Sequence, residues 1–262
     1  MTRESSPSVN SRRVRLYASA TFPCSYIPEQ MAAHVFVDTE LRINTELYGQ
    51  LIERGFRRSG NFFYRPQCPS CQACVPVRVP ASYFIPNRSQ RRTWQRNQDL
   101  VVTSAPASFN AEHFALYCRY LSQRHRDAGM DKPTPDDFAN FLYSEDIDTL
   151  VFEFREKSRL LAVAVVDRLA SGLSAVYTFY EPDASTRGLG TYAVLWQIHT
   201  AQEMALPWVY LGYWIKECRK MSYKTSFRPL EMLHGQTWQP LAVAREISAQ
   251  TSSLKAGSDK TE

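Results

Sequence analysis

The sequence predicts an α+β fold in which a mixed sheet is flanked by helices. Its 262 residues, 44% of them hydrophobic, are enough to bury a core and exclude a chain that is disordered throughout. After residue 98, strand-like apolar segments alternate with helical ones, and three strand-like segments in a row are separated only by short polar links. Before residue 98, prolines and arginines are mixed with short aromatic stretches. This contrast predicts an irregular basic part followed by a regular α+β domain.

The composition also predicts where these parts begin and end. We expect a flexible amino terminus at 1–13, which is polar and serine-rich, and a polar, disordered tail at 242–262. Between them we expect a basic, cysteine-containing domain at 14–98 and the regular domain at 99–241. No segment is apolar for long enough to span a membrane, and the first residues lack the apolar stretch of a secretion signal. We therefore expect a cytoplasmic protein without a membrane partner.

Local patterns predict each element in chain order. Short aromatic and valine-rich stretches at 61–64 and 75–79 predict strands, and Asn87 is suited to cap a helix that follows it. From residue 99 onward, strand-like and helical spacings of apolar residues alternate, and Thr134 is suited to cap a helix. In order, we expect a strand at 99–104, helices at 110–130 and 136–143, strands at 150–154, 160–167 and 173–180, a helix opened by 187–190 and ending near 205, a strand at 208–211, a helix from about 216, and a strand at 236–241.

This order resembles the Gcn5-related N-acetyltransferases, in which a glycine-rich turn joins the fourth strand to the third helix and holds a pyrophosphate. The resemblance implies an acyltransferase-like domain at 99–241. Gly188 and Gly190 match the glycines of that turn, whereas Ser185 stands where the family has Gln or Arg. A turn of this kind suits an anion at the amino end of a helix. The departure at Ser185 counts against coenzyme A as that anion.

The two halves of the chain differ in charge. Residues 1–100 contain 14 arginines, no lysine and seven acidic residues, a net charge of +7, and the rest of the chain carries −2. Guanidinium groups bind phosphates and stack on bases, so this excess of arginine indicates a nucleic-acid partner. A GC-rich genome, which favours arginine codons, is the alternative explanation for the missing lysines. Arg57, Arg58 and Arg65 flank the aromatic strands and could extend a phosphate-binding surface.

A cluster of cysteines lies in the basic half. The spacing of Cys68, Cys71 and Cys74 lets three thiolates converge on one metal ion or cluster. Cys24 is the candidate for a fourth ligand, with His34 as the alternative. Thiolate ligands allow zinc or an iron–sulfur cluster, and ordinary reduced thiols are the remaining interpretation.

Two runs of cations have helical spacing. Arg88, Arg91, Arg92 and Arg96 would share one face of a helix and match a phosphate backbone, while Trp94 would pack inward or stack on a base.

Farther along the chain, Lys216, Lys220 and Lys224 recur every four residues and would line one face of the helix expected there. Such a face binds phosphates or an acidic side chain. A solvated surface is the alternative for both runs.

The chain has no Gly-x-Ser-x-Gly motif and no paired histidine or carboxylate motif for a catalytic metal. A catalytic site in this chain would therefore work by positioning and electrostatics.

Several segments together resemble the arginyl-tRNA–protein transferase family, and within it the bacterial branch that transfers leucine. The matching segments are Gly55–Pro66, Cys68–Arg78, Ser89–Arg92, Ala175–Tyr180, Leu189–Tyr192 and Tyr210–Ile215. The resemblance implies transfer of leucine from leucyl-tRNA to the α-amino group of proteins that begin with Asp or Glu, which marks them for degradation by the N-degron pathway. An aminoacyl ester is already activated, so no cofactor is expected for the transfer itself.

On this resemblance the predicted site residues take roles. Glu181 or Asp183 would accept the proton of the attacking amine. The 3′ end of the tRNA would lie at Arg187, Gly188 and Gly190. The arginines at 88, 91, 92 and 96 would hold the tRNA backbone, and the lysines at 216, 220 and 224 would select the acidic first residue. Eukaryotic relatives carry a cysteine-ligated iron–sulfur cluster, which Cys24 and the cysteines at 68, 71 and 74 match loosely.

Three alternatives remain open from the sequence alone. They are an arginyl-transferring homologue, a coenzyme A-dependent N-acetyltransferase, and a non-enzymatic RNA-binding module with a zinc site. The sequence does not specify the oligomeric state.

Overall fold

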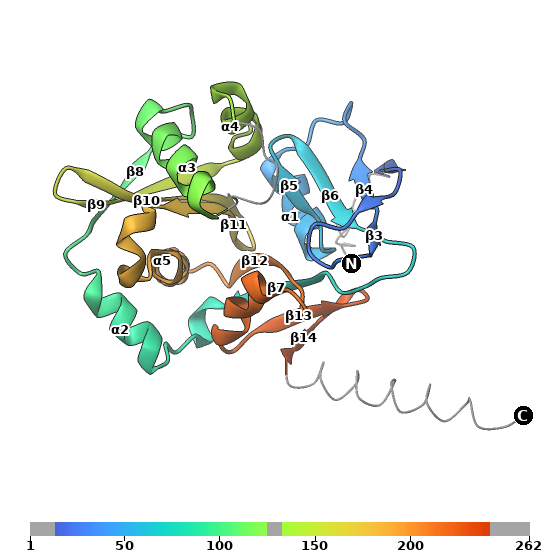
Figure 1. Ribbon diagram of the computed structural model, residues 1–262. Coiled ribbons are helices and arrows are strands. Elements are labelled where there is room, and N and C mark those ends of the chain that lie inside the picture. The colour runs from blue at the N-terminus through green and yellow to red at the C-terminus, as the bar shows by residue number, and fades with distance from the viewer. Residues whose placement is uncertain (1–13, 125–132, 242–262) are drawn as a thin grey trace, which may run out of the picture.

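A computed structural model describes residues 14–124 and 133–241 and confirms the α+β class. Helices lie on both faces of a large mixed sheet, and a smaller unit built from the amino-terminal residues packs at one end of it (Figure 1). The expected flexible terminus at 1–13, the tail at 242–262 and the end of the helix expected at 110–130 lie outside the described residues.

The large sheet has eight strands, in the order β14-β13-β7-β12-β11-β10-β9-β8. Its strands are β7 (Val75–Pro80), β8 (Val101–Ala105), β9 (Thr149–Glu156), β10 (Arg159–Leu169), β11 (Gly172–Tyr180), β12 (Trp208–Trp214), β13 (Glu231–His234) and β14 (Thr237–Pro240). The predicted meander is confirmed, because β9, β10 and β11 pair antiparallel in sequence order. β11 and β12 pair in parallel. β7 pairs with both β12 and β13, so the sheet includes a strand from before residue 98, and the division there stays a prediction.

The two faces of the sheet bury different helices, and β10 shows why. Alternate residues of a strand point to opposite faces. Ala162 and Ala164 pack in the core under α5 (Leu189–Glu203), and α2 (Arg88–Arg96) lies against α5. Val163 and Val165 pack in the core under α3 (Ala111–Arg124) and α4 (Pro135–Leu142). The predicted caps are confirmed: the side chains of Asn87 and Thr134 accept hydrogen bonds from the backbone N–H groups at the starts of α2 and α4.

The amino-terminal unit consists of a four-stranded sheet, one helix and a short hairpin. Its elements are β1 (Leu16–Ala18), β2 (Phe22–Pro23), β3 (Met31–Ala32), β4 (His34–Val37), α1 (Thr45–Glu53), β5 (Arg57–Ser59) and β6 (Phe62–Pro66). The 3₁₀ turn η1 (Ala81–Tyr83) follows β7 and packs against α5. The core of the amino-terminal unit includes Leu169 and Tyr210 from the large sheet. A buried ion pair joins the two parts, in which Arg58 donates to Asp167 at 2.7 and 2.6 Å and both side chains are almost completely buried. The unit is therefore fixed to the large sheet by apolar packing and by one buried charge pair.

The prediction of an α-helix from about residue 216 is wrong. The chain there forms the 3₁₀ helix η3 (Arg219–Ser226), which excludes Lys216. Hydroxyl groups explain the difference: Ser222 and Ser226 donate to backbone carbonyls three residues earlier, at 2.8 and 2.6 Å, and such bonds compete with α-helical pairing. The expected last strand is present as β14. It forms a hairpin with β13, which the sequence analysis missed.

Candidate functional site

The parallel strands β11 and β12 diverge after a short pairing. Their ladder joins Gly172–Ser174 to Trp208–Tyr210 and then ends. Both strands are irregular at this point. The register of β11 against β10 shifts next to Ala175, and that of β12 against β7 shifts between Tyr210 and Gly212. Such bulges are common beside active sites, because they re-aim backbone groups and end strand pairing.

Arg57 of β5 lies at this divergence. Its guanidinium donates from Nη2 to the carbonyl oxygen of Ala175 on β11. On the β12 side, a Cβ placed on Gly212 would lie 3.5 Å from Nε of Arg57, and Gly212 has a φ of +79°. Only 8% of Arg57 is exposed, and its Nη1 atom is buried without a hydrogen-bond partner. The amino-terminal unit thus inserts a cation between the two diverging strands.

Lys224 of η3 is a second buried cation beside Arg57. It is 7% exposed, and its Nζ donates to the carbonyl oxygen of Tyr213 at 2.5 Å. Burial, and next the positive charge of Arg57, lower the pKa of Lys224 to about 7. No carboxylate of the described residues forms an ion pair with Arg57 or Lys224.

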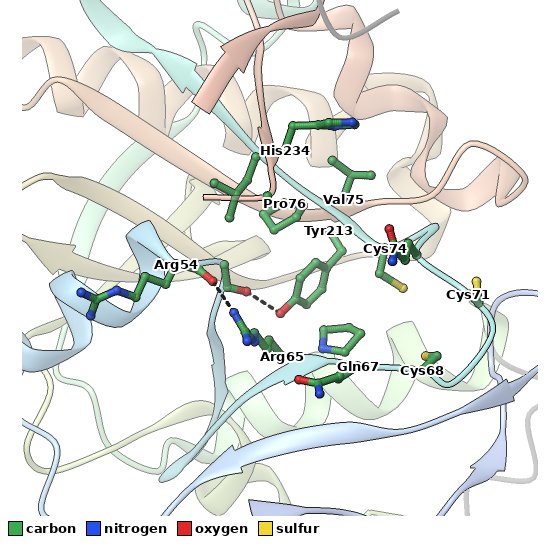
Figure 2. A pocket seen from close by; sticks show the side chains of 15 residues that line it. Arg54, Arg65, Gln67, Cys68, Cys71, Cys74, Val75, Pro76, Tyr213 and His234 are labelled. Carbon is green, nitrogen blue, oxygen red and sulfur yellow. Dashed lines mark hydrogen bonds between the residues drawn. The ribbon is translucent and has the colours of Figure 1, made fainter. Parts of the chain in front are cut away.

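A pocket of about 410 Å³ opens on the other side of Tyr213 (Figure 2). Tyr213 lies in the middle, with cysteine side chains on one side and Arg54 and Arg65 on the other. The hydroxyl of Tyr213 donates to the carbonyl oxygen of Gly55 at 2.7 Å. His234 also lines the pocket, whereas no Asp or Glu does. The charged groups around this pocket therefore favour an anionic or acidic ligand.

The glycine turn begins α5 on the opposite face of the sheet from the amino-terminal unit. Gly188 is the N-cap of α5 and has a φ of +67°, a conformation that glycine adopts without strain. The turn packs against the end of α2, because Asn97 donates to the carbonyl oxygen of Arg187 at 2.9 Å. Arg187 itself pairs with Asp99 at 2.8 Å and with Glu156. The assignment of Arg187 to the tRNA 3′ end stays a prediction, and two carboxylates share its charge.

The predicted tRNA-binding arginines do share a helix. Arg88, Arg91, Arg92 and Arg96 are exposed on α2, as the spacing predicts. Trp94 packs inward, stacked on Trp196 of α5 at 6.0 Å between ring centroids.

The extension of this surface through Arg57 and Arg58 is wrong, because both side chains are buried. From the sequence alone, both arginines are expected at the surface. A charged pair inside a strand bounded by glycines is the signal that could have marked them as interior.

The two predicted proton acceptors are both ion-paired. Glu181 is 8% exposed and accepts from Arg119 at 2.9 Å. Asp183, in the 3₁₀ helix η2 (Pro182–Arg187), accepts from Arg159 at 2.9 Å. Their catalytic role stays a prediction. Either carboxylate would have to give up an arginine partner to take a proton.

Contrary to the prediction from their spacing, the three lysines at 216, 220 and 224 do not line one face of a helix. A 3₁₀ helix has three residues per turn, so residues four apart do not share a face. Lys216 and Lys220 are exposed, while Lys224 is buried and reaches the site described above. Of the three predicted lysines, the structure thus brings one to the strand divergence.

The four predicted metal ligands lie in one region but do not form a ligand set. Cys24, Cys68, Cys71 and Cys74 are all reduced and partly buried. Burial, and next the neighbouring thiols, raise the pKa of Cys74 to about 12. Within 14–124 and 133–241, no group of three or more His, Cys, Asp or Glu side chains is arranged to hold a metal ion. Binding of a metal or cluster by these four cysteines stays a prediction. The alternative ligand, His34, packs edge-on against the ring of Phe22, with 5.0 Å between the ring centroids.

The parallel pair that diverges, the glycine turn and the helix that follows it match the arrangement expected for an acyltransferase-like domain at 99–241. Two family models match the chain: arginine-tRNA-protein transferase, N terminus, over residues 22–92, and the C terminus of the same family over 112–234. An aspartate/glutamate leucyltransferase of Hahella chejuensis is 51% identical over 229 residues, which are 87% of this chain and 98% of that protein. One from Nitrosococcus oceani is 51% identical over 226 residues, 86% of this chain and 95% of that protein. The chain belongs to the arginine-tRNA-protein transferase family and is therefore a transferase.

One solved structure with a similar arrangement of elements is distant in sequence. The carboxyl-terminal domain of a putative lysylphosphatidylglycerol synthetase from Agrobacterium fabrum has a TM-score of 0.47 and 12% identity, and covers 74% of this chain and 62% of that one. Among the described residues, no helix combines the length and apolar character needed to cross a membrane.

Proposed function

We propose that this enzyme transfers leucine from leucyl-tRNA to the α-amino group of proteins that begin with Asp or Glu. The relatives named above carry this specificity in their names, and they match the chain over most of its length. The observation that carries the proposal is a pair of buried basic side chains, Arg57 and Lys224, which have no carboxylate partner among the described residues and lie at the divergence of β11 and β12, beside a pocket whose charged groups are all basic. An acceptor with a negative first residue is complementary to that site.

The proposed partners approach from two faces of the sheet. The glycine turn and the exposed arginines of α2 lie next to each other, which supports binding of the tRNA 3′ end and backbone on that side. The pocket beside Tyr213 supports entry of the acceptor from the side of the amino-terminal unit. The divergence of the strands lies between these two surfaces, where the reacting groups would meet.

The reaction needs positioning and the movement of one proton. The neutral α-amine attacks the ester carbonyl carbon of leucyl-tRNA, an amide bond forms, and the bond to the ribose oxygen breaks. The amine proton leaves, and the ribose oxygen gains one. An N-terminal amine has a pKa of about 7.7–8.0, so a usable fraction is neutral near pH 7. Holding the two reactants in line can lower the barrier by about 7–11 kcal/mol.

The transfer would take place without a cofactor, since the ester is already activated. We further propose that the enzyme acts in the cytoplasm, where aminoacyl-tRNA is made, and that its products enter the N-degron pathway.

One experiment separates this function from the alternatives. Purified protein is given radiolabelled Leu-tRNA or Arg-tRNA with peptides that differ only in the first residue, Asp, Glu or Ala. We expect label from Leu-tRNA on the Asp and Glu peptides. Transfer of arginine alone would show an arginyl-transferring homologue, and acetyl transfer from acetyl-coenzyme A without any aminoacyl transfer would show an acetyltransferase. RNA binding that survives replacement of Gly188 and Gly190, without any transfer, would show a binding module.

A further inference from the structure

We propose that Arg57 and Lys224 together bind the side-chain carboxylate of the acceptor's acidic first residue. This inference rests on the proposed function and names the groups that select its substrate. The geometry at the divergence of β11 and β12 leads to it in three steps.

The first step is the charge balance around Arg57. Burying a cation costs free energy unless an anion or several hydrogen bonds compensate it. The next residue, Arg58, follows that rule, because Asp167 accepts two of its hydrogen bonds. Arg57 has one hydrogen bond from Nη2, a buried Nη1 with no partner, and no ion pair within the described residues.

The second step concerns the groups that face Arg57. Tyr48, Tyr64 and Tyr213 all interact with its charge, and burial raises the pKa of each tyrosine, so all three are neutral near pH 7. Lys224 also interacts with the charge of Arg57, and the thiol of Cys218 in turn faces Lys224. Burial and the charge of Arg57 lower the pKa of Lys224 to about 7, so an anion bound between the two side chains would favour the charged form of Lys224 and balance the charge of Arg57.

The third step is access. Tyr213 separates this pair from the pocket, since its ring lines the pocket and its carbonyl oxygen accepts from Lys224. Gly55 also lines the pocket and precedes Arg57 by two residues. An acceptor in the pocket would therefore contact Tyr213, whose carbonyl oxygen accepts from Lys224, and Gly55, which lies two residues before Arg57. A small carboxylate suits this enclosed position, whereas the exposed arginines of α2 suit tRNA phosphates.

The test measures the preference of the enzyme for one acceptor peptide over another, because a loss of total activity alone could arise from misfolding. Transfer of leucine is measured for peptides that begin with Asp or Asn and are otherwise identical. The Asn side chain has nearly the same shape without the charge. Wild-type protein should prefer the Asp peptide strongly. Arg57→Gln should lower kcat/KM for the Asp peptide about 10- to 100-fold, the usual effect of losing a hydrogen bond to a charged group, and leave the Asn peptide nearly unchanged.

Two further variants and a control complete the design. Arg57→Lys keeps the charge and should restore part of the preference for Asp. Lys224→Met, in a different element, should lower the same preference and provides a second measurement if Arg57→Gln does not fold. Arg42→Gln, which changes an arginine of the same unit whose side chain is 82% exposed, should leave both peptides unaffected.

The outcomes distinguish this inference from the proposed function. No transfer by wild-type protein to either acidic peptide would overturn the proposed function itself. Wild-type transfer with an unchanged Asp preference in Arg57→Gln and Lys224→Met would overturn only the carboxylate site. An equal loss for Asp and Asn peptides would also overturn it, because that result would assign Arg57 to the fold or to the oxyanion of the transfer step.

Discussion

Replacing Lys224 with methionine should change how the stability of this protein depends on pH. In the folded protein, burial and the charge of Arg57 hold the pKa of Lys224 at about 7. In the unfolded chain, a lysine has a pKa of about 10.4. Between these two values, the unfolded state holds a proton that the folded state has lost. Stability therefore rises with pH in this window, by about 1.4 kcal/mol per pH unit.

The sign follows from the direction of the shift. Because the folded pKa is lowered, the penalty for burying Lys224 is greatest below pH 7 and disappears as the pH approaches 10.4. Between pH 7 and pH 9, wild-type protein should gain about 2–3 kcal/mol of stability relative to Lys224→Met. The variant also loses the hydrogen bond to Tyr213, but that loss is a constant offset and does not change the slope.

The assay is urea denaturation of both proteins at pH 7, 8 and 9, with the difference in free energy of unfolding plotted against pH. Other titrating groups are shared, so their contributions cancel in the difference. Lys220→Met is the matched control, since Lys220 lies in the same 3₁₀ helix but is exposed, and its difference plot should be flat. A flat plot for Lys224→Met as well would refute the assignment of Lys224 as a buried lysine with a lowered pKa.

Three other predictions concern tRNA binding, the buried ion pair and the glycine turn. Changing Arg91 and Arg92 together to Glu should raise the KM for leucyl-tRNA steeply and flatten its dependence on salt, measured from 50 to 200 mM; an unchanged KM would remove α2 from the tRNA surface. Asp167→Asn should lower the free energy of unfolding by about 3–5 kcal/mol, because it leaves Arg58 buried without its partner, and a loss below about 1 kcal/mol in urea denaturation would contradict this. Gly188→Ala should cost about 1–2 kcal/mol from its left-handed φ, and an unchanged melting temperature would argue against that backbone conformation.

Some elements could be predicted from the sequence because local signals determine them. Asn87 and Thr134 are followed three residues later by Gln90 and Asp137, and each pair forms the reciprocal capping bonds that start a helix. The meander of β9, β10 and β11 has the same local character, since short links force neighbouring strands to pair.

Other features depend on contacts between residues far apart in the chain, and no local pattern predicts them. β7 reads as a strand, but its place between β12 and β13 depends on residues more than 100 positions away. Lys224 illustrates the same limit on the site, because the four-residue spacing favoured a helical stripe and the hydroxyl groups of η3 prevented it. Arg57 was assigned to the surface, because arginine in a sequence usually indicates solvent exposure.

The arginines of the first hundred residues differ in their surroundings: some are buried and paired, and others are exposed. Arg58 is buried and neutralised by Asp167, and Arg78 is buried and paired with both Glu231 and Glu53, so two of these three carboxylates come from the acidic half of the chain. The exposed arginines of α2 keep their charge toward solvent. Arg57 alone among these three buried arginines has no counter-charge in the described part of the chain. The difference in net charge between the halves is thus partly cancelled on folding. The proposed acceptor site rests on the lack of an anion beside one buried cation, and the sum of charges in a segment does not reveal that lack.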